Sequence, residues 1–268
     1  MTITVHKGTA LITGASSGIG AIYADRLAKA GYDLIVVARS ADRLKELARR
    51  LTDASGRSIE TLTADLTQPQ DLMRVEAILK SDQSITLLVN NAGIAAVAPL
   101  LQSNVDEMER MIALNVTAPT RLAYAAAPAF VARGSGTIIN IASIVAINPK
   151  LLNGVYAASK AFVLAFSQSL DNELASKGIR IQAVLPGATA TDLWDKAGHP
   201  VSNLPKEIVM TTEDMVDAAL AGLAQGELVT IPALPNSADW DAFEMARNAL
   251  SPNLSRSEPA PRYRKAAP

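Results

Sequence analysis

The stretch TGASSGIG, residues 13–20, follows the apolar run of residues 10–12 and precedes apolar residues at helical spacing. A diphosphate binds at such a junction, because the free N–H groups at a helix start attract an anion. Gly14 permits a tight turn, Gly18 leaves the backbone bare for the ligand, and Gly20 lets the helix pack closely on the strand. The Gly-x-x-x-Gly-x-Gly spacing therefore predicts a nucleotide site, although an ordinary small-residue turn has the same appearance.

Length and composition indicate one globular domain. The chain has 268 residues, of which 49% are apolar and 19% charged, enough to bury a large core. We expect this domain to cover residues 1–250, followed by a proline-rich, basic tail over residues 251–268. A formal net charge of −1 provides no basic surface for a nucleic acid or an anionic membrane, so the expected partner is a small molecule.

Several kinds of site are excluded by residue counts. The chain has no cysteine, which excludes disulfides, thiolate catalysis and cysteine-bound zinc. Its two histidines, His6 and His199, form no cluster, so no metal site is predicted. No apolar stretch approaches the ~20 residues that span a bilayer, and the N-terminus lacks a signal-peptide pattern. We expect a cytoplasmic protein without membrane association.

Short runs rich in β-branched residues and leucine alternate with helical patterns along the chain. Most are apolar on both faces, as parallel strands are when helices cover both sides of their sheet. We therefore expect an α/β fold, a Rossmann-like doubly wound sheet of about seven strands with helices on both faces. Its ligand crevice lies at the carboxyl ends of the strands. The runs cover residues 9–13, 33–38, 58–62, 85–89, 137–141, 179–184 and 228–231.

Tyr156 and Lys160 are four residues apart in a helical pattern, which places them on one helix face. A neighbouring cation favours the phenolate and lowers a tyrosine pKa from its reference value of about 10 toward neutrality. A tyrosine tuned in this way can exchange a proton with a substrate. The same spacing also occurs in amphipathic helices that have a half-buried tyrosine and an exposed lysine.

Two further polar segments follow predicted strands. Ser143 comes shortly after the run 137–141, where its hydroxyl can polarise a carbonyl group. The second segment is Asn90-Asn91-Ala92-Gly93, after the run 85–89. Each is also compatible with an ordinary turn, since serine and asparagine are common at strand ends.

Taken in chain order, these segments are similar to the motif series of the short-chain dehydrogenase/reductase superfamily, in its short single-domain branch. The motifs are TGxxxGIG at 13–20, NNAG at 90–93 and YxxxK at 156–160, accompanied by Asn115, Ser143 and Pro186-Gly187. Several motifs in one order are more specific than any one of them. The resemblance implies a Rossmann-like fold that binds a nicotinamide cofactor and moves hydride between it and a carbonyl or alcohol carbon.

The resemblance also implies individual roles. Tyr156 corresponds to the general acid/base, and Lys160 to the residue that lowers its pKa, with help from the oxidised nicotinamide, and holds the nicotinamide ribose. Ser143 corresponds to the hydroxyl that orients the carbonyl, and Asn115 to the residue that maintains a proton-relay water. The implied cofactor-binding residues are Gly14, Ser16, Ser17, Gly18, Ile19, Gly20, Asp65, Leu66, Asn91, Ala92, Gly93, Tyr156, Lys160, Pro186, Gly187 and Thr189.

Arg39 predicts which nicotinamide cofactor binds. In many dinucleotide sites an acidic residue about twenty positions after the glycines accepts the adenosine ribose hydroxyls, and it repels a 2′-phosphate. Arg39 stands there instead, and a guanidinium binds phosphate through two hydrogen bonds. NADP(H) is therefore expected over NAD(H). Many relatives that use NADP carry a basic residue in the glycine turn, where this chain has Ser16 and Ser17, and Arg43 is placed to compensate.

The substrate pocket is expected between the segment after Ser143, the approach to Tyr156 and a lid over residues 188–212. Its mainly apolar lining favours a hydrophobic or medium-sized ketone or aldehyde, although the same side chains also suit core packing. Alanine-rich helices over residues 117–133 and 154–177 favour a homodimer or homotetramer, but packing on the chain's own sheet accounts for them equally. The predicted substrate residues are Ser143, Val145, Leu152, Tyr156 and Trp194.

Three other functions use related folds. A catalytically silent protein that senses nicotinamide nucleotides or acts as a scaffold would have lost the tyrosine or the lysine, and both are present here. Nucleotide-sugar epimerases and dehydratases are usually longer and differ in glycine spacing, and enoyl reductases have a wider tyrosine–lysine spacing. The four catalytic candidates together favour carbonyl chemistry, with the silent protein as the alternative.

Overall fold

The computed structural model describes residues 7–264, so His6 lies outside the described residues. The chain divides into two compact units, Met1–Pro232 and Ala233–Pro268. The division falls earlier than the expected boundary at residue 250. The helix α9 (Ser237–Asn248), which the expected boundary places in the large domain, belongs to the second unit and has no buried residue.

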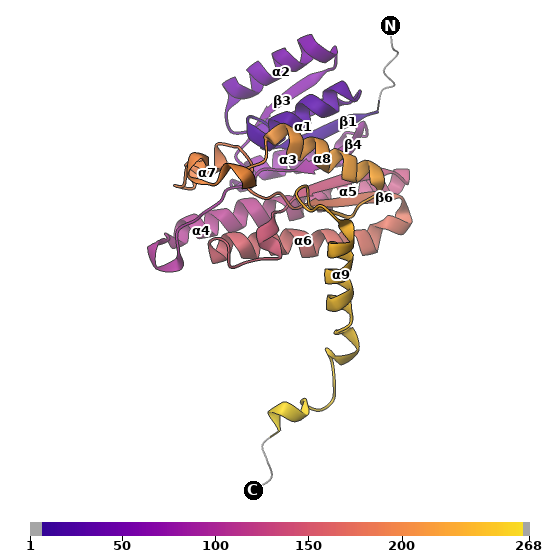
Figure 1. The fold of residues 1–268 in the computed structure, drawn as a ribbon. Helices are drawn as coiled ribbons and strands as arrows, with labels where there is room; N and C mark the ends of the chain where they lie inside the picture. Colours follow the sequence, from indigo (N-terminus) through magenta and orange to yellow (C-terminus); the bar gives the residue numbers. More distant parts are fainter. Residues whose placement is uncertain (1–6, 265–268) are drawn as a thin grey trace. The chain divides into compact units, whose positions relative to one another are not determined.

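A seven-stranded parallel sheet forms the centre of the first unit (Figure 1), which confirms the predicted α/β class. Its order is β3-β2-β1-β4-β5-β6-β7, and every neighbouring pair is parallel. The strands are β1 (Thr9–Thr13), β2 (Asp33–Ala38), β3 (Ile59–Thr63), β4 (Ile85–Asn90), β5 (Gly136–Ile141), β6 (Ile179–Val184) and β7 (Val229–Thr230).

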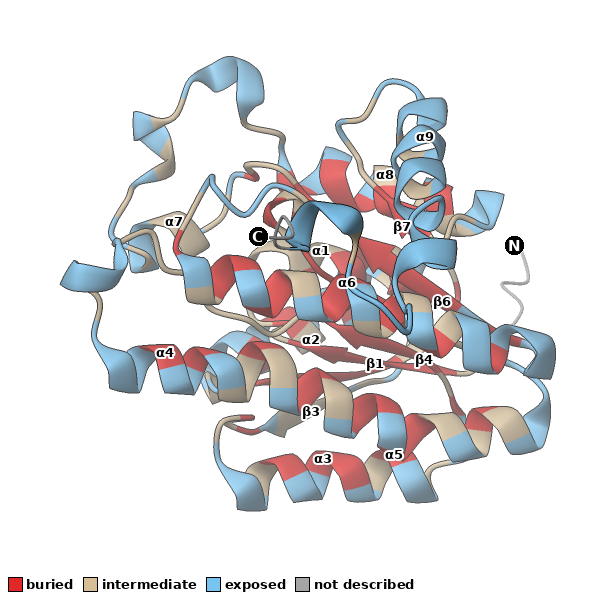
Figure 2. Cartoon of the chain, turned by 90° about the horizontal axis from the view of Figure 1, so that it is seen from below, coloured by how far each residue is buried: buried red, intermediate tan, exposed pale blue. Residues whose placement is uncertain are grey.

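Helices cover both faces of this sheet, and each layer has its own apolar core. The first core receives side chains from α1 (Gly18–Lys29), α2 (Ala41–Ser55) and α8 (Thr212–Gln225). The second receives them from α3 (Pro69–Ser81), α5 (Ala118–Arg133) and α6 (Gly154–Leu174). Figure 2 shows buried strands between helices whose outer sides are exposed. Two short helices, α4 (Val105–Ile112) and α7 (Leu193–Lys196), complete the elements needed below.

The strands serve both cores because successive side chains point to opposite faces of a sheet. On β1, Ala10 and Ile12 belong to the first core, whereas Leu11 belongs to the second. Two-sided burial explains why these runs are continuously apolar.

The chain changes direction between β1 and β4, which are neighbours although β2 and β3 come between them in sequence. After β3 the chain crosses back over the sheet, so the loops that follow β1 and β4 leave in opposite directions. This topology opens a crevice at their carboxyl ends, where doubly wound sheets bind ligands.

The segment after β6 leaves the sheet and returns to a point next to where it began. Thr189 pairs with Met210 as a parallel bridge, and the Ala190 and Met210 N–H groups donate to Met210 O and Ala188 O, each at 2.9 Å. The Thr212 hydroxyl donates to Ala190 O at 2.7 Å. Both ends of the predicted lid, residues 188–212, are therefore tied together, and α7 lies between them.

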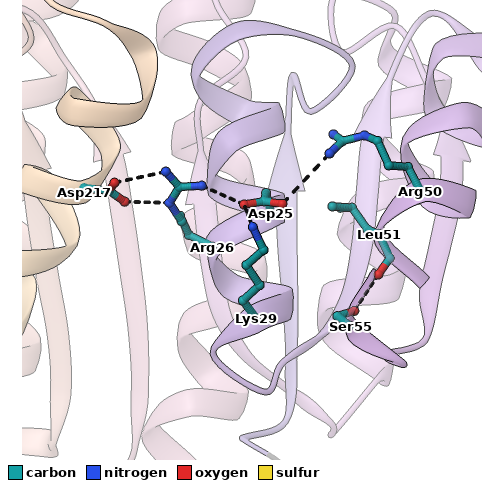
Figure 3. Close-up of polar contacts among 7 residues, drawn as sticks. All are labelled: Asp25, Arg26, Lys29, Arg50, Leu51, Ser55 and Asp217. Carbon is teal, nitrogen blue, oxygen red and sulfur yellow. Dashed lines mark hydrogen bonds and ion pairs between the residues drawn. The ribbon is translucent and has the colours of Figure 1, made fainter. Parts of the chain in front are cut away.

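Charged side chains join three helices of the first layer (Figure 3). Asp25 of α1 accepts hydrogen bonds from Arg26 at 2.7 Å and Lys29 at 2.8 Å, with Arg50 of α2 at 4.0 Å. Arg26 also binds Asp217 of α8 through two hydrogen bonds, at 2.7 and 3.0 Å. Asp25 is only 6% exposed, so this cluster fixes α1 between α2 and α8.

Within residues 7–264, no helix combines the length and apolar character needed to cross a bilayer. In the same part of the chain, no group of three or more histidine, aspartate or glutamate side chains is arranged to hold a metal ion.

Candidate active site

The glycine turn joins β1 to α1 at the crevice. Gly14 has φ +67, and a Cβ there would lie 2.8 Å from the Ala92 Cα. A Cβ on Gly20 would lie 2.5 Å from Gly14 O and from the Asn91 side-chain nitrogen. The turn therefore needs glycine at both positions, and Gly20 packs closely against Gly14 and Asn91.

Thr13 and Asn91 hold the glycine turn to the end of β4. The Thr13 hydroxyl accepts hydrogen bonds from the N–H groups of Asn91 and Ala92, each at 3.0 Å, and donates to Val89 O at 3.3 Å. The Asn91 amide donates to Thr13 O at 2.8 Å and Gly14 O at 3.2 Å. The Asn91 side chain thus holds the glycine turn in shape. The Thr13 side chain holds the start of the Asn91 segment in the same way, a role that sequence reasoning did not give it.

The start of α1 is uncapped by side chains in the described part of the chain. Ser17 is the residue before the helix, and among the described residues its side chain caps none of the helix N–H groups. The first turn of α1 contains no acidic residue. Gly18 has φ +54, and a Cβ there would lie 3.2 Å from the Thr191 methyl group of the lid. Ser16 and Ile19 flank this position and are partly exposed. A bare, uncapped helix start suits a diphosphate.

Arg39 is exposed directly after β2, at the same edge of the sheet. Asp65, after β3, accepts from the N–H and hydroxyl of Thr67 at 3.0 and 2.8 Å and lies 3.6 Å from Arg110. Desolvation raises the pKa of Asp65, but the hydrogen bonds from Thr67 and the charges of Arg39 and Arg110 outweigh it and lower that pKa. The Leu66 side chain is buried in the second core, so it positions this loop from inside.

Asn153 caps α6 and places Tyr156. Its side-chain oxygen accepts from the N–H groups of Val155 at 2.9 Å and Tyr156 at 3.3 Å. Its side-chain nitrogen donates to Ala98 O at 2.6 Å and to the Ser103 hydroxyl at 3.1 Å. Sequence reasoning missed this residue, although an asparagine directly before a helical run is a usual capping signal.

Lys160 and Asn115 lie beside Tyr156. The Lys160 ammonium donates to Ile141 O at 2.9 Å and lies 5.8 Å from the Tyr156 ring centroid. Asn115 belongs to a widened helical turn between α4 and α5, a feature often found at functional sites. Its side-chain oxygen accepts a hydrogen bond from the Ile94 N–H, and its side-chain nitrogen donates to Ile94 O. The same nitrogen donates to the Ser159 hydroxyl at 3.2 Å, and that hydroxyl donates to Tyr156 O. These contacts tie α6 to the NNAG segment, where Gly93 lies against Asn115 and Lys160.

Burial governs the protonation of Tyr156 and Lys160 in the protein without cofactor. Burial raises the pKa of Tyr156 to about 12, although a hydrogen bond with Ser143 acts to lower it. Burial lowers the pKa of Lys160 to about 8. Desolvation disfavours the charged form of both groups and is the larger effect here. The pKa near neutrality expected from the sequence requires the oxidised nicotinamide as well as the ammonium, so it stays a prediction for the complex.

Ser143 follows β5 and is 9% exposed. Its hydroxyl accepts from the Val145 N–H and donates to Pro186 O, both at 3.4 Å, in addition to bonding Tyr156. Pro186 O also accepts from the Ile144 N–H at 3.0 Å. Gly187 and Thr189 continue this loop, where the Thr189 hydroxyl donates to Gly187 O at 3.2 Å. Ser143 is therefore both the turn-capping serine and the hydroxyl beside the phenol.

Apolar side chains surround the phenol. Val145, Tyr156 and Ala157 form a small buried cluster with Met108 and Met111 of α4. Leu152 packs on it partly buried, as do Ile94, Ala95 and Ala96, which sequence reasoning did not identify. Val145 is only 2% exposed, so it packs within this apolar cluster and presents almost no surface to a substrate.

Trp194 lies in α7 of the lid. Its indole N–H donates to Thr189 O at 3.0 Å, and its ring lies 6.5 Å from that of His199. The tryptophan predicted to contact substrate therefore holds α7 to the first residues of the lid.

Comparisons with known proteins agree with this geometry. A family model described as short chain dehydrogenase matches residues 8–201. The chain is 33% identical over 230 residues to an uncharacterized oxidoreductase of Staphylococcus saprophyticus, covering 85% of this chain and 96% of the relative.

Two solved structures are similar over nearly the whole chain. One is a short-chain dehydrogenase from Sphingobium yanoikuyae in complex with NADPH, at 50% identity and a TM-score of 0.93, covering 96% of this chain and 100% of that one. The other is the bulky-bulky ketone specific alcohol dehydrogenase from Comamonas testosteroni, at 45% identity and a TM-score of 0.89, covering 97% and 99%.

Proposed function

Since this chain belongs to the short-chain dehydrogenase family, we propose that it transfers hydride between NADP(H) and a carbonyl or secondary alcohol carbon, reducing a hydrophobic ketone or aldehyde. The observation that carries this proposal is the cluster of Tyr156, Ser143 and Lys160. The fold brings these three side chains from α6 and the end of β5 to one buried place beside an apolar wall.

The reduced nicotinamide supplies hydride to the carbonyl carbon when bound. As hydride arrives, negative charge develops on the carbonyl oxygen, and hydrogen-bond donors stabilise it most where water is excluded. Tyr156 is protonated because burial raises its pKa to about 12, so the resting side chain is ready to donate a proton. Ser143 bonds the phenol and supplies the second hydroxyl.

Lys160 supports this chemistry with its charge, 5.8 Å from the centre of the Tyr156 ring. With a pKa of about 8 it carries a positive charge at neutral pH, close to the phenol. That charge favours the phenolate left after proton donation. The chain from Asn115 through Ser159 to Tyr156 O holds the helix turn that carries both residues.

NADP(H) is the proposed cofactor because Arg39 is exposed after β2, where a ribose-binding acid would otherwise stand. The similar Sphingobium structure is in complex with NADPH. The residues that fit the diphosphate are those of the bare glycine turn at the uncapped start of α1.

A hydrophobic substrate is proposed because the wall around Tyr156 is apolar and would leave a charged group unpaired. The similarity to an alcohol dehydrogenase specific for bulky-bulky ketones supports ketones with two large substituents as first candidates.

The testing experiment follows NADPH oxidation at 340 nm against aromatic, alicyclic and aliphatic ketones and aldehydes, with Tyr156→Phe in parallel. We expect turnover that Tyr156→Phe lowers by at least about 10²-fold, because the general acid is lost. Tyr32→Phe is the matched control, since Tyr32 lies before β2, at the opposite end of the strand from the crevice. NADPH binding without turnover of any panel member would favour the silent sensor instead.

Arg39→Asp tests the cofactor proposal. Replacing a cation by an anion beside the 2′-phosphate should reverse the preference, lowering kcat/KM with NADPH and raising it with NADH. Steady-state kinetics with both cofactors measures the ratio. If the two efficiencies barely change, Arg39 does not recognise the phosphate.

A further inference from the structure

An ion pair connects the lid to the helix that follows Arg39. The Arg43 guanidinium of α2 lies 3.8 Å from the Asp192 carboxylate, directly before α7. Both side chains are 58% exposed, and Lys196 of α7 lies 3.9 Å from the same carboxylate oxygen. An exposed pair at this distance is weak, so Arg43 exchanges readily between partners.

Arg43 also faces the glycine turn. It lines a hollow of about 440 Å³ together with Ser16 of the turn, and the other charged side chains there are Asp42, Glu46 and Arg50. Arg39 stands four residues before Arg43, so both guanidinium groups belong to the junction of β2 and α2. A phosphate on the adenosine ribose would lie at this junction, within reach of Arg43.

The lid touches the cofactor turn next to Asp192. A Cβ on Gly18 would lie 3.2 Å from the methyl group of Thr191. The lid therefore lies against the glycine turn at Thr191, and its next residue, Asp192, lies beside Arg43, where the adenosine ribose would bind. On the other side of Asp192, Trp194 holds α7 to the loop that contains Thr189.

We infer that Asp192 is a specificity-determining residue for the cofactor, because its carboxylate competes with the 2′-phosphate of NADP(H) for Arg43. A doubly charged phosphate attracts the guanidinium more strongly than one carboxylate does, so NADP(H) takes Arg43 and releases Asp192. NAD(H) has no such phosphate and leaves the pair intact. The lid is thus tied to α2 with NAD(H) and free of it with NADP(H).

The test uses adenosine 2′,5′-bisphosphate and adenosine 5′-monophosphate as probes, with calorimetry of the wild type and of Asp192→Asn. These probes carry no nicotinamide, so binding is read without turnover. Removing the competitor should tighten adenosine 2′,5′-bisphosphate by about two- to fivefold and leave the monophosphate unchanged. The gain should shrink between about 0.02 M and about 0.3 M salt, because the pair is exposed.

Two further variants identify the route of the effect. In an Arg43→Gln background, Asp192→Asn should give no gain, since the shared partner is absent. Asp195→Asn is the matched control, because Asp195 lies three residues further along the lid and makes no ion pair among residues 7–264. It should change the affinity for the bisphosphate less than Asp192→Asn does.

Three outcomes would overturn the inference. The first is an affinity for adenosine 2′,5′-bisphosphate that Asp192→Asn leaves unchanged. The second is a gain from Asp192→Asn that is as large in the Arg43→Gln background as in the wild type. The third is a gain from Asp195→Asn as large as that from Asp192→Asn. The inference rests on the proposed use of NADP(H), and the same data separate the two. Wild-type protein that binds both probes equally would overturn the cofactor proposal as well, whereas a preference unaffected by Asp192→Asn would overturn only the inference.

Discussion

At Tyr156, burial decides the resting protonation state. The phenol and the Lys160 amine are both almost completely buried, and each is shifted toward its neutral form, to a pKa of about 12 and about 8. A neutral phenol suits reduction, where the residue must donate. Oxidation of an alcohol needs the phenolate, which requires additional positive charge near the ring.

We predict that Tyr156 does not ionise below pH 10 in the protein alone. Tyrosinate absorbance at 295 nm should be the same in wild type and Tyr156→Phe throughout pH 7–10, because burial holds the proton on the phenol. With NADP⁺ added, a difference between the two proteins should appear within that range, since a cation near the ring lowers the pKa. A difference in the protein alone would show that Lys160 dominates over burial.

Among the helices, α6 depends on the residue directly before it for its start. Asn153 caps the helix and also ties it to the segment of residues 98–103. We expect Asn153→Ala to lower the free energy of unfolding by about 1–2 kcal/mol, since both a cap and a buried amide contact are lost. Chemical denaturation provides the value, and kcat should fall as well because Tyr156 is three residues away.

Asn148→Ala is the control for that variant. Asn148 is exposed in the preceding loop, and its side chain makes no hydrogen bond among the described residues. It should change stability by less than about 0.5 kcal/mol. Equal losses in the two variants would contradict a capping role.

The cluster at Asp25 makes the packing of α1, α2 and α8 sensitive to pH. Desolvation raises the pKa of Asp25, but the hydrogen bonds and charges of Lys29 and Arg26 outweigh it, so this pKa lies below its usual value of 3.8. A carboxyl with a lowered folded-state pKa stabilises the fold fully above the unfolded value. It loses that contribution as the pH falls through the folded value.

Asp25→Asn should therefore cost about 2 kcal/mol at pH 7, and the difference from wild type should diminish below about pH 4. Urea denaturation at several pH values measures both quantities. Asp53→Asn is the control, because Asp53 is exposed in its pair with Arg49 and should cost less than about 0.5 kcal/mol. An Asp25→Asn penalty that persists unchanged at pH 3 would mean that packing rather than charge is responsible.

At the scale of the whole molecule, the alanines that favoured an oligomer are only partly explained within one chain, because Ala158 and Ala165 of α6 are exposed. Ala123, Ala125, Ala126 and Ala157 are at most 2% exposed and belong to the chain's own cores. A different feature of the same helices remains exposed. Tyr124 of α5 stacks on Phe166 of α6, which stacks on Phe162, and Tyr124 is 69% exposed.

We predict that this aromatic face joins copies of the chain. Light scattering should give the mass of a dimer or tetramer for the wild type and a smaller mass for Tyr124→Glu, because a carboxylate in an apolar contact is unpaired. Met73→Glu is the control, since Met73 is 49% exposed on α3. A monomeric wild type at micromolar concentration would contradict the prediction.

The sequence alone determined the layers and the edge of the sheet that carries the site. Runs rich in β-branched residues and leucine predicted all seven strands to within one residue at each end, although β3 is not buried on either face. Polar residues shortly after two of these runs marked Asn91 and Ser143. The glycine spacing of residues 14–20 predicted the turn after β1, and the four-residue interval between Tyr156 and Lys160 predicted that they share one helix face. These signals are local, because a strand's burial, a turn's φ and a helix face depend on residues a few positions apart.

Only the tertiary structure decided how these residues behave. The pKa of Tyr156, the double role of Asn91, the capping contacts of Asn153 and the pairing of Arg43 with Asp192 each depend on segments far apart in the chain. Desolvation and long-range contacts depend on all the residues that pack around a side chain, and these residues come from distant parts of the chain, so no short stretch of sequence reveals them.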